Sequence, residues 1–480
     1  MVPALVRDTV SLKQKGIFPS VLDPTSSPPP PNTNRSVRYV RSLERRLARA
    51  EQRLQAIEGS RAWRIVLGYR RLRRLITGAV ISPPVHEVDN TAPALETKIH
   101  AVDFDAQVSK VREALKRWVA AAKSAAGDEV VVMFSGTTSY QFRRANRPIR
   151  LSKVFLDQGV PVLFSYFRFN LQELPASENQ LLLQSPIDIT EIVLPEILAA
   201  DFGDKENVLF ASFPHQLMVR YLAYAALHGW TIVYDVRDDW EEFARVGAAV
   251  WYEPEFEWYV ATHADVVTAV SRPLASKIEL LAGRPVEVNR NALDPGFPRR
   301  QILIDSERPL IGYFGHLTEK WFDWSLMIRL ARSLTNVSFE LAGHQAPQLD
   351  LPDNISILGL LDHQQLATVT ARWAGALIPF KMGPLTDAVD PIKVYEYLHL
   401  RLPTVSTYMP QLIGYPGVTV VESPEDFIAA VARLVESPRP LGDEVEGWLS
   451  ENTWEGRVEQ YRASWRSPDG GRMGQLTIET

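Results

Sequence analysis

From residue 130 onward the chain alternates short apolar runs with longer amphipathic stretches, and this pattern restricts the fold more than any other feature. Runs such as VVVMFS, VPVLFSY, NVLFAS, WTIVYDV, PLIGYFG and VSFELAG are continuous and rich in β-branched and aromatic residues. A strand that is apolar on both faces is buried on both faces, as in a parallel sheet that helices cover from two sides. The pattern therefore predicts an α/β protein with two doubly wound, Rossmann-like domains.

Breaks in composition predict the domain boundaries. DPTSSPPPPNTN is a Pro- and Ser-rich linker, and RNALDPGFPRRQ separates the two sets of strand runs. We predict a disordered segment at 1–34, a helical Arg-rich arm at 35–80, a linker at 81–100, a first α/β domain at 101–296, a second at 297–465 that ends in a C-terminal helix, and a tail at 466–480.

The arm is strongly basic although the whole chain is acidic. Residues 35–77 hold 13 Arg against 3 Glu, whereas the formal net charge of the chain is −5. Apolar residues between Val40 and Ile57 recur at spacings of three and four, which predicts a short coiled coil. The following stretch, 60–78, has the pattern of a basic amphipathic helix. Contact with an anionic membrane surface, docking on an acidic partner, self-association and a solvated helix all stay open, whereas nucleic-acid binding is disfavoured by the acidic remainder.

Composition also argues against several kinds of chemistry. The chain has no Cys, and its nine His form no closely spaced pair, so thiol catalysis is excluded and a zinc site has no local support. No GxGxxG or Walker A motif follows a predicted strand, which argues against dinucleotide oxidoreductases and P-loop enzymes. Neither a signal-peptide pattern nor a long apolar segment is found. We expect a cytoplasmic protein, with peripheral contact to the inner face of the membrane through the arm as a further expectation.

The stretch DAVDPIKVYEYLHLRLPTVS, residues 387–406, places a cation in the first turn of a predicted helix. Asp390 followed by Pro391 predicts a helix start with Asp390 as the N-cap. The free N–H groups, the helix dipole and Lys393 then converge on an anion site that suits a diphosphate. Glu396 lies three residues further on the same face, where its carboxylate can accept hydrogen bonds from a ribose diol. An ordinary Lys–Glu surface pair is the alternative interpretation.

This stretch resembles the P-x-K-x-x-E signature of GT-B glycosyltransferases, in particular the retaining group called family 4. PLIGYFGHLTEKWFDWSLMIRLA, residues 309–331, resembles the first strand, loop and helix of the donor domain of that family. IVYDVRDDWEEF and ADVVTAVSRPL resemble the close of the acceptor domain, and NTWEGRVEQYRASW resembles the helix that crosses back to it. The resemblance covers roughly residues 130–465. In addition, SRAWR resembles the arms of bacterial surface-polysaccharide enzymes.

The resemblance implies transfer of a sugar from a nucleotide-diphosphate sugar to a glycan or lipid-linked acceptor in bacterial surface-polysaccharide synthesis, with retention. It makes 101–296 the acceptor-side domain and 297–465 the donor domain. The diphosphate would be stabilised by Lys393, Lys320 and helix N–H groups, so that no metal, cofactor or side-chain base is needed. A non-catalytic scaffold of the same fold and a nucleotide-sugar epimerase are the alternatives.

The residues also depart from the family pattern. Ala388 stands where the family commonly has a sugar-binding Glu, His316 stands where an Arg commonly follows the loop glycine, and Arg237 or Asp238 replaces a His. The candidate catalytic residues are Lys393, Glu396, Lys320 and Asp238; the candidate donor-binding residues are Gly315, His316, Gly343, Gly359, Thr386, Asp387 and Asp390; and the candidate acceptor-side residues are Arg147, His215 and Arg237.

Other motifs have simpler interpretations. Asp103 and Asp105 form a DxD sequence, but acidic residues are routine at the start of a helix. Asp239 is expected either to face an acceptor with Asp238 or to cap the helix that follows. A lone His such as His215 is more often structural than functional.

Overall fold

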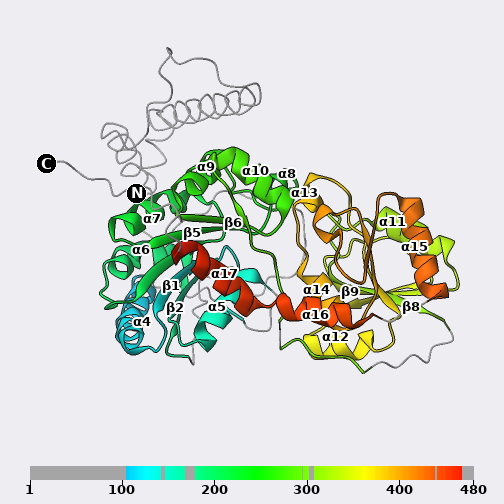
Figure 1. The fold of residues 1–480 in the computed structure, drawn as a ribbon, viewed down its shortest axis with the longest axis horizontal. Helices are drawn as coiled ribbons and strands as arrows, with labels where there is room; N and C mark the ends of the chain where they lie inside the picture. The colour runs from blue at the N-terminus through cyan, green and yellow to red at the C-terminus, as the bar shows by residue number, and fades with distance from the viewer. Residues whose placement is uncertain are drawn as a thin grey trace, which may run out of the picture. The chain divides into compact units, whose positions relative to one another are not determined.

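A computed structural model describes residues 104–141, 146–167, 179–294, 296–301, 308–437 and 441–466. The predictions for the arm, the two linkers before residue 101, Asp103 and residues 467–480 lie outside the described residues. Within the described residues, two parallel sheets are each flanked by helices. This confirms the predicted α/β class (Figure 1).

The first domain is built on a sheet whose described strands pair in the order β3-β2-β1-β4-β5-β6-β7, all in parallel. The chain order reverses between β1 and β4, and this switch point is where ligands of doubly wound sheets bind. The strands are β1 (Glu129–Phe134), β2 (Val162–Tyr166), β3 (Leu182–Pro186), β4 (Glu206–Ala211), β5 (Thr231–Val236), β6 (Val266–Ala269) and β7 (Glu287–Val288).

Helices cover both faces of this sheet, and β1 shows why its sequence is apolar throughout. Val130, Val132 and Phe134 pack into one core cluster, with α4, α6, α7, α9 and α10, whereas Val131 and Met133 pack into another, with α5 and the helix α17 (Trp454–Arg466). The helices of the domain are α4 (Phe104–Ser124), α5 (Arg147–Asp157), α6 (Ile187–Leu198), α7 (Gln216–Leu227), α8 (Trp240–Arg245), α9 (Pro254–His263) and α10 (Arg272–Ala282).

The second domain repeats this architecture with a sheet in the order β10-β9-β8-β11-β12-β13. Its pairs are again parallel. The strands are β8 (Leu310–His316), β9 (Ser338–His344), β10 (Ile355–Gly359), β11 (Gly375–Ile378), β12 (Thr404–Thr407) and β13 (Val418–Val421). The helices are α11 (Trp324–Ser333), α12 (His363–Thr370), α13 (Pro384–Asp387), α14 (Ile392–His399), α15 (Pro424–Glu436) and α16 (Asp443–Glu451), with a short 3-10 helix η1 (Pro410–Leu412).

The helix α17 (Trp454–Arg466) follows the second domain in the chain but packs on the first. Trp454, Val458 and Tyr461 are buried in the same cluster as α5, and Arg462 Nε donates to Glu129 Oε1 at 2.8 Å. Figure 1 shows α17 in red, lying across the first domain. The chain thus crosses between the domains twice, before β8 and before α17.

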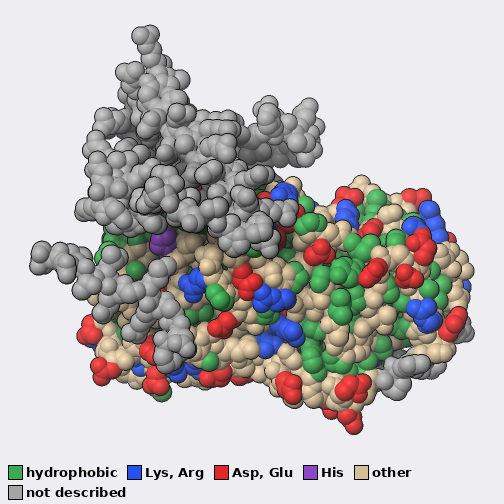
Figure 2. Space-filling view, turned by 45° about the horizontal axis from the view of Figure 1, so that its top comes forward, with side chains coloured by type: hydrophobic (Ala, Val, Ile, Leu, Met, Phe, Trp, Pro, Cys, Tyr) green, Lys and Arg blue, Asp and Glu red, His purple; other side chains and the backbone are tan. Residues whose placement is uncertain are grey.

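The described surface carries both signs of charge. Figure 2 shows acidic and basic side chains next to each other on one face. The described surface also holds exposed ion pairs such as Arg112–Glu196 and Arg329–Glu425. None of the described helices is both long enough and apolar enough to cross a membrane.

Candidate functional site

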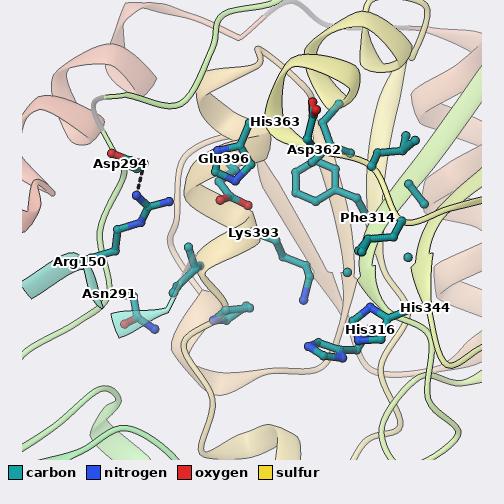
Figure 3. Close-up of a pocket in the computed structure, with 18 of the residues that line it drawn as sticks. Arg150, Asn291, Asp294, Phe314, His316, His344, Asp362, His363, Lys393 and Glu396 are labelled. Carbon is teal, nitrogen blue, oxygen red and sulfur yellow. Dashed lines mark ion pairs between the residues drawn. The ribbon is translucent and has the colours of Figure 1, made fainter. Parts of the chain in front are cut away.

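A pocket of about 950 Å³ lies between the two domains. Its walls come from the residues at the carboxyl ends of β5, β8 and β9, from the loop after β10, and from the start of α14. This is the edge of parallel sheets at which ligands bind. Figure 3 shows Lys393, Glu396, His316 and His344 around this space, with Arg150 entering from the first domain.

Lys393 and Glu396 line the pocket from the first two turns of α14. Glu396 is only 5% exposed. Burial raises the pKa of Glu396 to about 7, although Arg150 and Lys393 oppose the shift. Burial lowers the pKa of Lys393 to about 8, and the Lys393 Nζ lies 4.8 Å from the centroid of the Phe380 ring. These are the properties of a ligand site and not of an exposed surface pair.

No hydrogen bond or ion pair within the described part of the chain engages the Lys393 Nζ or the Glu396 carboxylate. Leaving a buried carboxyl group and a half-buried ammonium group without partners costs stability, because each has lost contact with water. A ligand that carries an anion next to hydroxyl groups would engage both side chains. The alternative of an ordinary Lys–Glu pair is therefore not what the structure contains.

The predicted role of Asp390 as a helix cap is wrong. The helix α14 begins at Ile392 after Pro391, and no side chain caps it. The Asp390 carboxylate instead accepts from Asn291 N at 2.7 Å, from the Tyr395 hydroxyl at 2.9 Å and from the Tyr415 hydroxyl at 3.1 Å. Because these three donors hold the carboxylate, it cannot turn toward the helix N–H groups. Through Asn291, Asp390 links the segment between the two domains to the start of α14.

Two glycines shape the floor beneath Lys393. Gly315 has φ +143°, and a Cβ there would stand 2.9 Å from the Lys393 Cε and 2.8 Å from the Tyr313 hydroxyl. Gly315 pairs with Gly343 in the sheet register, and a Cβ on Gly343 would stand 1.8 Å from the Gly315 carbonyl oxygen. The strand ends can therefore approach closely, and the Lys393 side chain can pass over them, only because both residues lack a side chain.

His316 follows Gly315 and faces His344 at a ring-centroid separation of 4.4 Å. Burial lowers the pKa of His316 to about 4, and the nearby His344 and Lys393 add to the shift. His316 is thus neutral at neutral pH, so it offers a hydrogen-bonding group but no charge. Positive charge on this side of the pocket comes from Lys393.

The first domain contributes Arg237 and Asp238, which follow β5 and line the pocket. The Arg237 Nε lies 3.4 Å from Asp238 Oδ2, and burial raises the pKa of Asp238 to about 6. Asp239 has the other role left open by the sequence: it accepts from Glu242 N at 3.1 Å as the N-cap of α8. The structure therefore separates the two neighbouring acids, with Asp238 at the pocket and Asp239 in a structural position.

Four predicted donor-side residues do not line the pocket. The Lys320 Nζ donates to the Gly247 carbonyl of the first domain at 3.1 Å on the exposed side. Gly359 ends β10 just before the pocket wall, and the hydroxyl of Thr386 donates to a backbone carbonyl within its own loop. Asp387 ends the short helix α13, where burial raises its pKa.

Arg147 and His215, predicted on the acceptor side, also lie outside the pocket wall. Arg147 is 3% exposed, and its Nε donates to both carboxylate oxygens of Asp235 at 3.0 and 2.9 Å. Its Nη2 reaches the Tyr461 hydroxyl at 2.9 Å, so Arg147 fastens α17 to the sheet. His215 caps α7 by accepting from Leu217 N at 3.3 Å.

Sequence reasoning missed Arg150, one turn after Arg147 in α5. Arg150 lines the pocket and forms a 2.5 Å ion pair with Asp294, shown as a dashed line in Figure 3. Its charge is one of the two that oppose the raised pKa of Glu396. Both arginines belong to the same sequence motif, NRPIR, and only the rotation of α5 on the sheet decides which one faces the pocket. Near this end, His363 and Asp362 of the α12 start also line the wall.

Among the described residues, no three His, Asp or Glu side chains gather closely enough to hold a metal ion. The polar groups of the pocket include a lysine and a carboxylate on α14, two histidines at the strand ends, Asp362 and His363 at the start of α12, and charged pairs from the first domain.

Comparison with known proteins gives one sequence relative and a consistent fold. No family model matches the chain. A Bacillus subtilis (strain 168) protein, TuaH, whose name assigns it a glycosyltransferase role in teichuronic acid biosynthesis, is 24% identical over 274 residues, which cover 51% of this chain and 67% of that protein.

Two solved structures illustrate the fold. HepE of Anabaena, in complex with UDP and glucose, aligns with a TM-score of 0.52 at 11% identity over 71% of this chain and all of that one (100%). The UDP-forming α,α-trehalose-phosphate synthase of Burkholderia vietnamiensis aligns with a TM-score of 0.50 at 11% identity, covering 71% of this chain and 97% of that one. These structural likenesses show that the chain has the GT-B fold.

Proposed function

We propose that the protein transfers a sugar from a nucleotide-diphosphate sugar to a glycan or lipid-linked acceptor in the synthesis of a bacterial surface polysaccharide, with retention at the anomeric carbon. One observation carries the proposal: a buried Glu396 and a half-buried Lys393 stand together, without protein partners among the described residues, at the start of a helix in an inter-domain pocket. The similarity to TuaH supports the reaction class and the polysaccharide context.

The charges of the pocket suit a nucleoside diphosphate. The start of α14 presents unpaired N–H groups and the positive end of the helix dipole, and Lys393 adds a full charge at the same place. Because Gly315 and Gly343 have no side chains, the diphosphate can approach the backbone at the ends of β8 and β9. Together these groups would stabilise the negative charge that develops on the leaving diphosphate, and such stabilisation is commonly the largest contribution to catalysis.

Glu396 lies one helical turn deeper and suits the ribose. A carboxylate accepts two hydrogen bonds, which matches the vicinal hydroxyls of a ribose. The raised pKa of Glu396 falls again when hydroxyl donors bind the charged form. The base would then lie toward the loop after β10 and the start of α12, where Leu360, Asp362 and His363 line the pocket.

The transfer step breaks the bond between the anomeric carbon and the diphosphate oxygen and forms a bond from that carbon to an acceptor oxygen. In the proposed retaining reaction, the acceptor proton passes to the leaving diphosphate, so no protein base is consumed. Metal independence is part of the proposal, because Lys393 and the helix N–H groups supply the positive charge. EDTA should therefore leave the rate unchanged, and proton NMR of the product should show the anomeric configuration of the donor.

The test is the shift in melting temperature on addition of UDP, GDP, ADP or dTDP at millimolar concentration to the whole chain. A ligand at 100 times its dissociation constant stabilises a protein by about 2.7 kcal/mol, which is a shift of several degrees. We expect one nucleotide to shift the intact protein, and Glu396→Ala to abolish both the shift and sugar transfer.

Glu451→Gln is the matched control, because Glu451 is an exposed acid on α16 outside the pocket. It should keep the full shift. The proposal fails if none of the nucleotides stabilises the intact protein while unfolding stays cooperative, and the scaffold interpretation then becomes the better one.

A further inference from the structure

A row of aromatic side chains leads away from the pocket along the carboxyl edge of the first sheet. We define this aromatic row as Trp321, Phe243, Trp240, Trp251 and His215. Neighbouring ring centroids are separated by 6.0 Å, 6.0 Å, 5.2 Å and 5.9 Å in that order. The row begins at the pocket, because the Trp321 ring stands 5.9 Å from that of His316.

The topology explains why residues this far apart in sequence meet. His215 is the N-cap of α7, the helix that follows β4, and Trp240 is the first residue of α8, the helix that follows β5. These strands are parallel neighbours, so both residues lie at the same edge of the sheet. Trp321 comes from the connection between β8 and α11 in the second domain. The row therefore spans both domains at the edge where ligands of such sheets bind.

Two further observations indicate that the row is a binding surface and not only core. Trp321, Phe243, Trp251 and His215 are half-buried, so each ring keeps part of its surface in contact with solvent. Trp240 is 95% buried, and its indole N–H has no hydrogen-bond acceptor in the described structure. A buried donor of this kind is normally satisfied, so the Trp240 N–H is a polar group beside the row that the described structure leaves unpaired.

We infer that the aromatic row binds the acceptor, and that the acceptor is a carbohydrate chain whose pyranose rings pack on these side chains. This inference rests on the proposed function, and it chooses the glycan from the two acceptor classes left open there. The axial C–H groups of a pyranose form a flat apolar face that packs on an aromatic ring, while its hydroxyl groups require polar partners at the edges.

The row offers both kinds of contact. Beside the middle of the row, the Arg237 guanidinium stands 5.2 Å from the centroid of the Trp240 ring, and Arg237 and its neighbour Asp238 both line the pocket. A lipid chain has no hydrogen-bonding atoms to pair with charged or polar groups, and it packs best on aliphatic side chains. Planar rings interleaved with hydrogen-bonding groups therefore favour a sugar chain.

The experiment measures binding of the full 480-residue chain to an immobilised panel of oligosaccharides of four or more pyranose rings, neutral and uronic-acid-containing. The nucleotide that gives the melting shift is present at saturation. We expect Trp251→Ala to weaken binding of the recognised oligosaccharide at least tenfold and Trp251→Tyr, which keeps an aromatic face, to restore most of it. Trp258→Ala is the matched control, because Trp258 is half-buried on α9 of the same domain and has no ring contact with the row.

The nucleotide-induced melting shift of Trp251→Ala should equal that of the wild type, which separates this inference from the proposed function. The inference is overturned if no oligosaccharide binds, or if Trp251→Ala binds as tightly as the wild type, while the nucleotide shift persists. It is also overturned if the row instead takes a farnesyl phosphate probe in a manner that Trp251→Ala abolishes. Loss of the nucleotide shift in the wild type would remove the proposed function itself.

Discussion

At the scale of single residues, the pocket depends on ionisable groups that the protein holds in an unfavourable state. Burial shifts the pKa of Lys393 down to about 8 and that of Glu396 up to about 7, so each group is partly driven toward its neutral form. A ligand with a diphosphate and a ribose would restore the charged forms. Such destabilised groups are typical of sites where stability is lower so that binding is stronger.

This predicts a pH dependence of nucleotide binding. Only the protonated form of Lys393 attracts a diphosphate, and the bound diphosphate in turn raises the pKa of Lys393. Affinity should therefore rise toward about pH 7.5 as Glu396 ionises, and should fall above pH 8 as Lys393 loses its proton, by at most about tenfold per pH unit. The measurement is isothermal titration of the recognised nucleoside diphosphate between pH 6.5 and 9.5.

Lys393→Met serves as the control, because it keeps an unbranched apolar stem of similar length without a charge. Its binding should be weak at every pH and should lack the decline above pH 8. A wild-type affinity that stays level from pH 7 to pH 9.5 would contradict the role given to this lysine.

At the scale of elements, the site forms where the ends of β8 and β9 pack closely against the start of α14. Gly315 and Gly343 pair at the ends of the strands, and the Lys393 side chain crosses above them. The lysine on the helix and the glycines on the strands therefore belong to one packing arrangement. The sequence indicated Gly315 through its loop, but the contact between Gly315 and Lys393 depends on how α14 lies against the sheet.

Gly343→Ala tests this arrangement. The added Cβ would stand 1.8 Å from the Gly315 carbonyl oxygen, which is backbone and cannot turn aside, so the strand ends must separate. We expect the free energy of unfolding to fall by about 1–3 kcal/mol, as for other overpacked sites. Nucleotide binding should be lost as well, because the floor under Lys393 moves.

The comparison variant is Gly447→Ala. Gly447 lies within α16, and a Cβ there would meet no heavy atom within 4 Å. Alanine is the better helix former by about 1 kcal/mol, so this variant should be as stable as the wild type or slightly more stable. Equal stability and nucleotide binding of Gly343→Ala and Gly447→Ala would show that the strand ends can relax.

At the scale of the whole molecule, a buried polar network joins the first sheet, the inter-domain segment and α17. Arg147 is its centre: besides Asp235 and Tyr461, it donates to Asn289 Oδ1 at 2.8 Å and to Asn291 Oδ1 at 3.1 Å. Asn291 in turn donates to Asp390 at the start of α14. The network therefore connects the packing of α17 to the placement of the nucleotide-site helix.

Arg147→Leu should destabilise the protein by about 3–5 kcal/mol, because it leaves the Asp235 carboxylate buried without its charge partner. Denaturation by urea measures the loss. Arg147→Leu combined with Asp235→Asn should recover part of it, since the second change removes the stranded charge.

Arg112→Leu provides the contrast within the same domain. The Arg112–Glu196 pair is 42% and 46% exposed, and losing an exposed pair costs less than about 1 kcal/mol. If Arg147→Leu lowered the free energy of unfolding by no more than Arg112→Leu does, the network would not hold the domains as described.

Much of the fold could be predicted from the sequence, because strands and helices are determined largely by residues that are close together in the chain. A run such as VVVMFS is apolar at every position, and only a strand covered on both faces can bury all of it. The joint placement of Lys393 and Glu396 was also predictable, because a spacing of three puts both side chains on one helical face. The start of α14 was predicted one residue too early, since the chain stays extended through Pro391 while three distant donors hold Asp390.

The sequence by itself determined the α/β class and the helix that carries Lys393 and Glu396. Both follow from patterns of apolar and polar residues that are close together in the chain. Only the tertiary structure decided that Arg150 and not Arg147 faces the pocket, and that Asp238 and not Asp239 does. It alone assembled the aromatic row, whose members come from separate loops. The physical reason is that the rotation of a helix on a sheet, and the alignment of strand ends, depend on packing between segments that are distant in the chain.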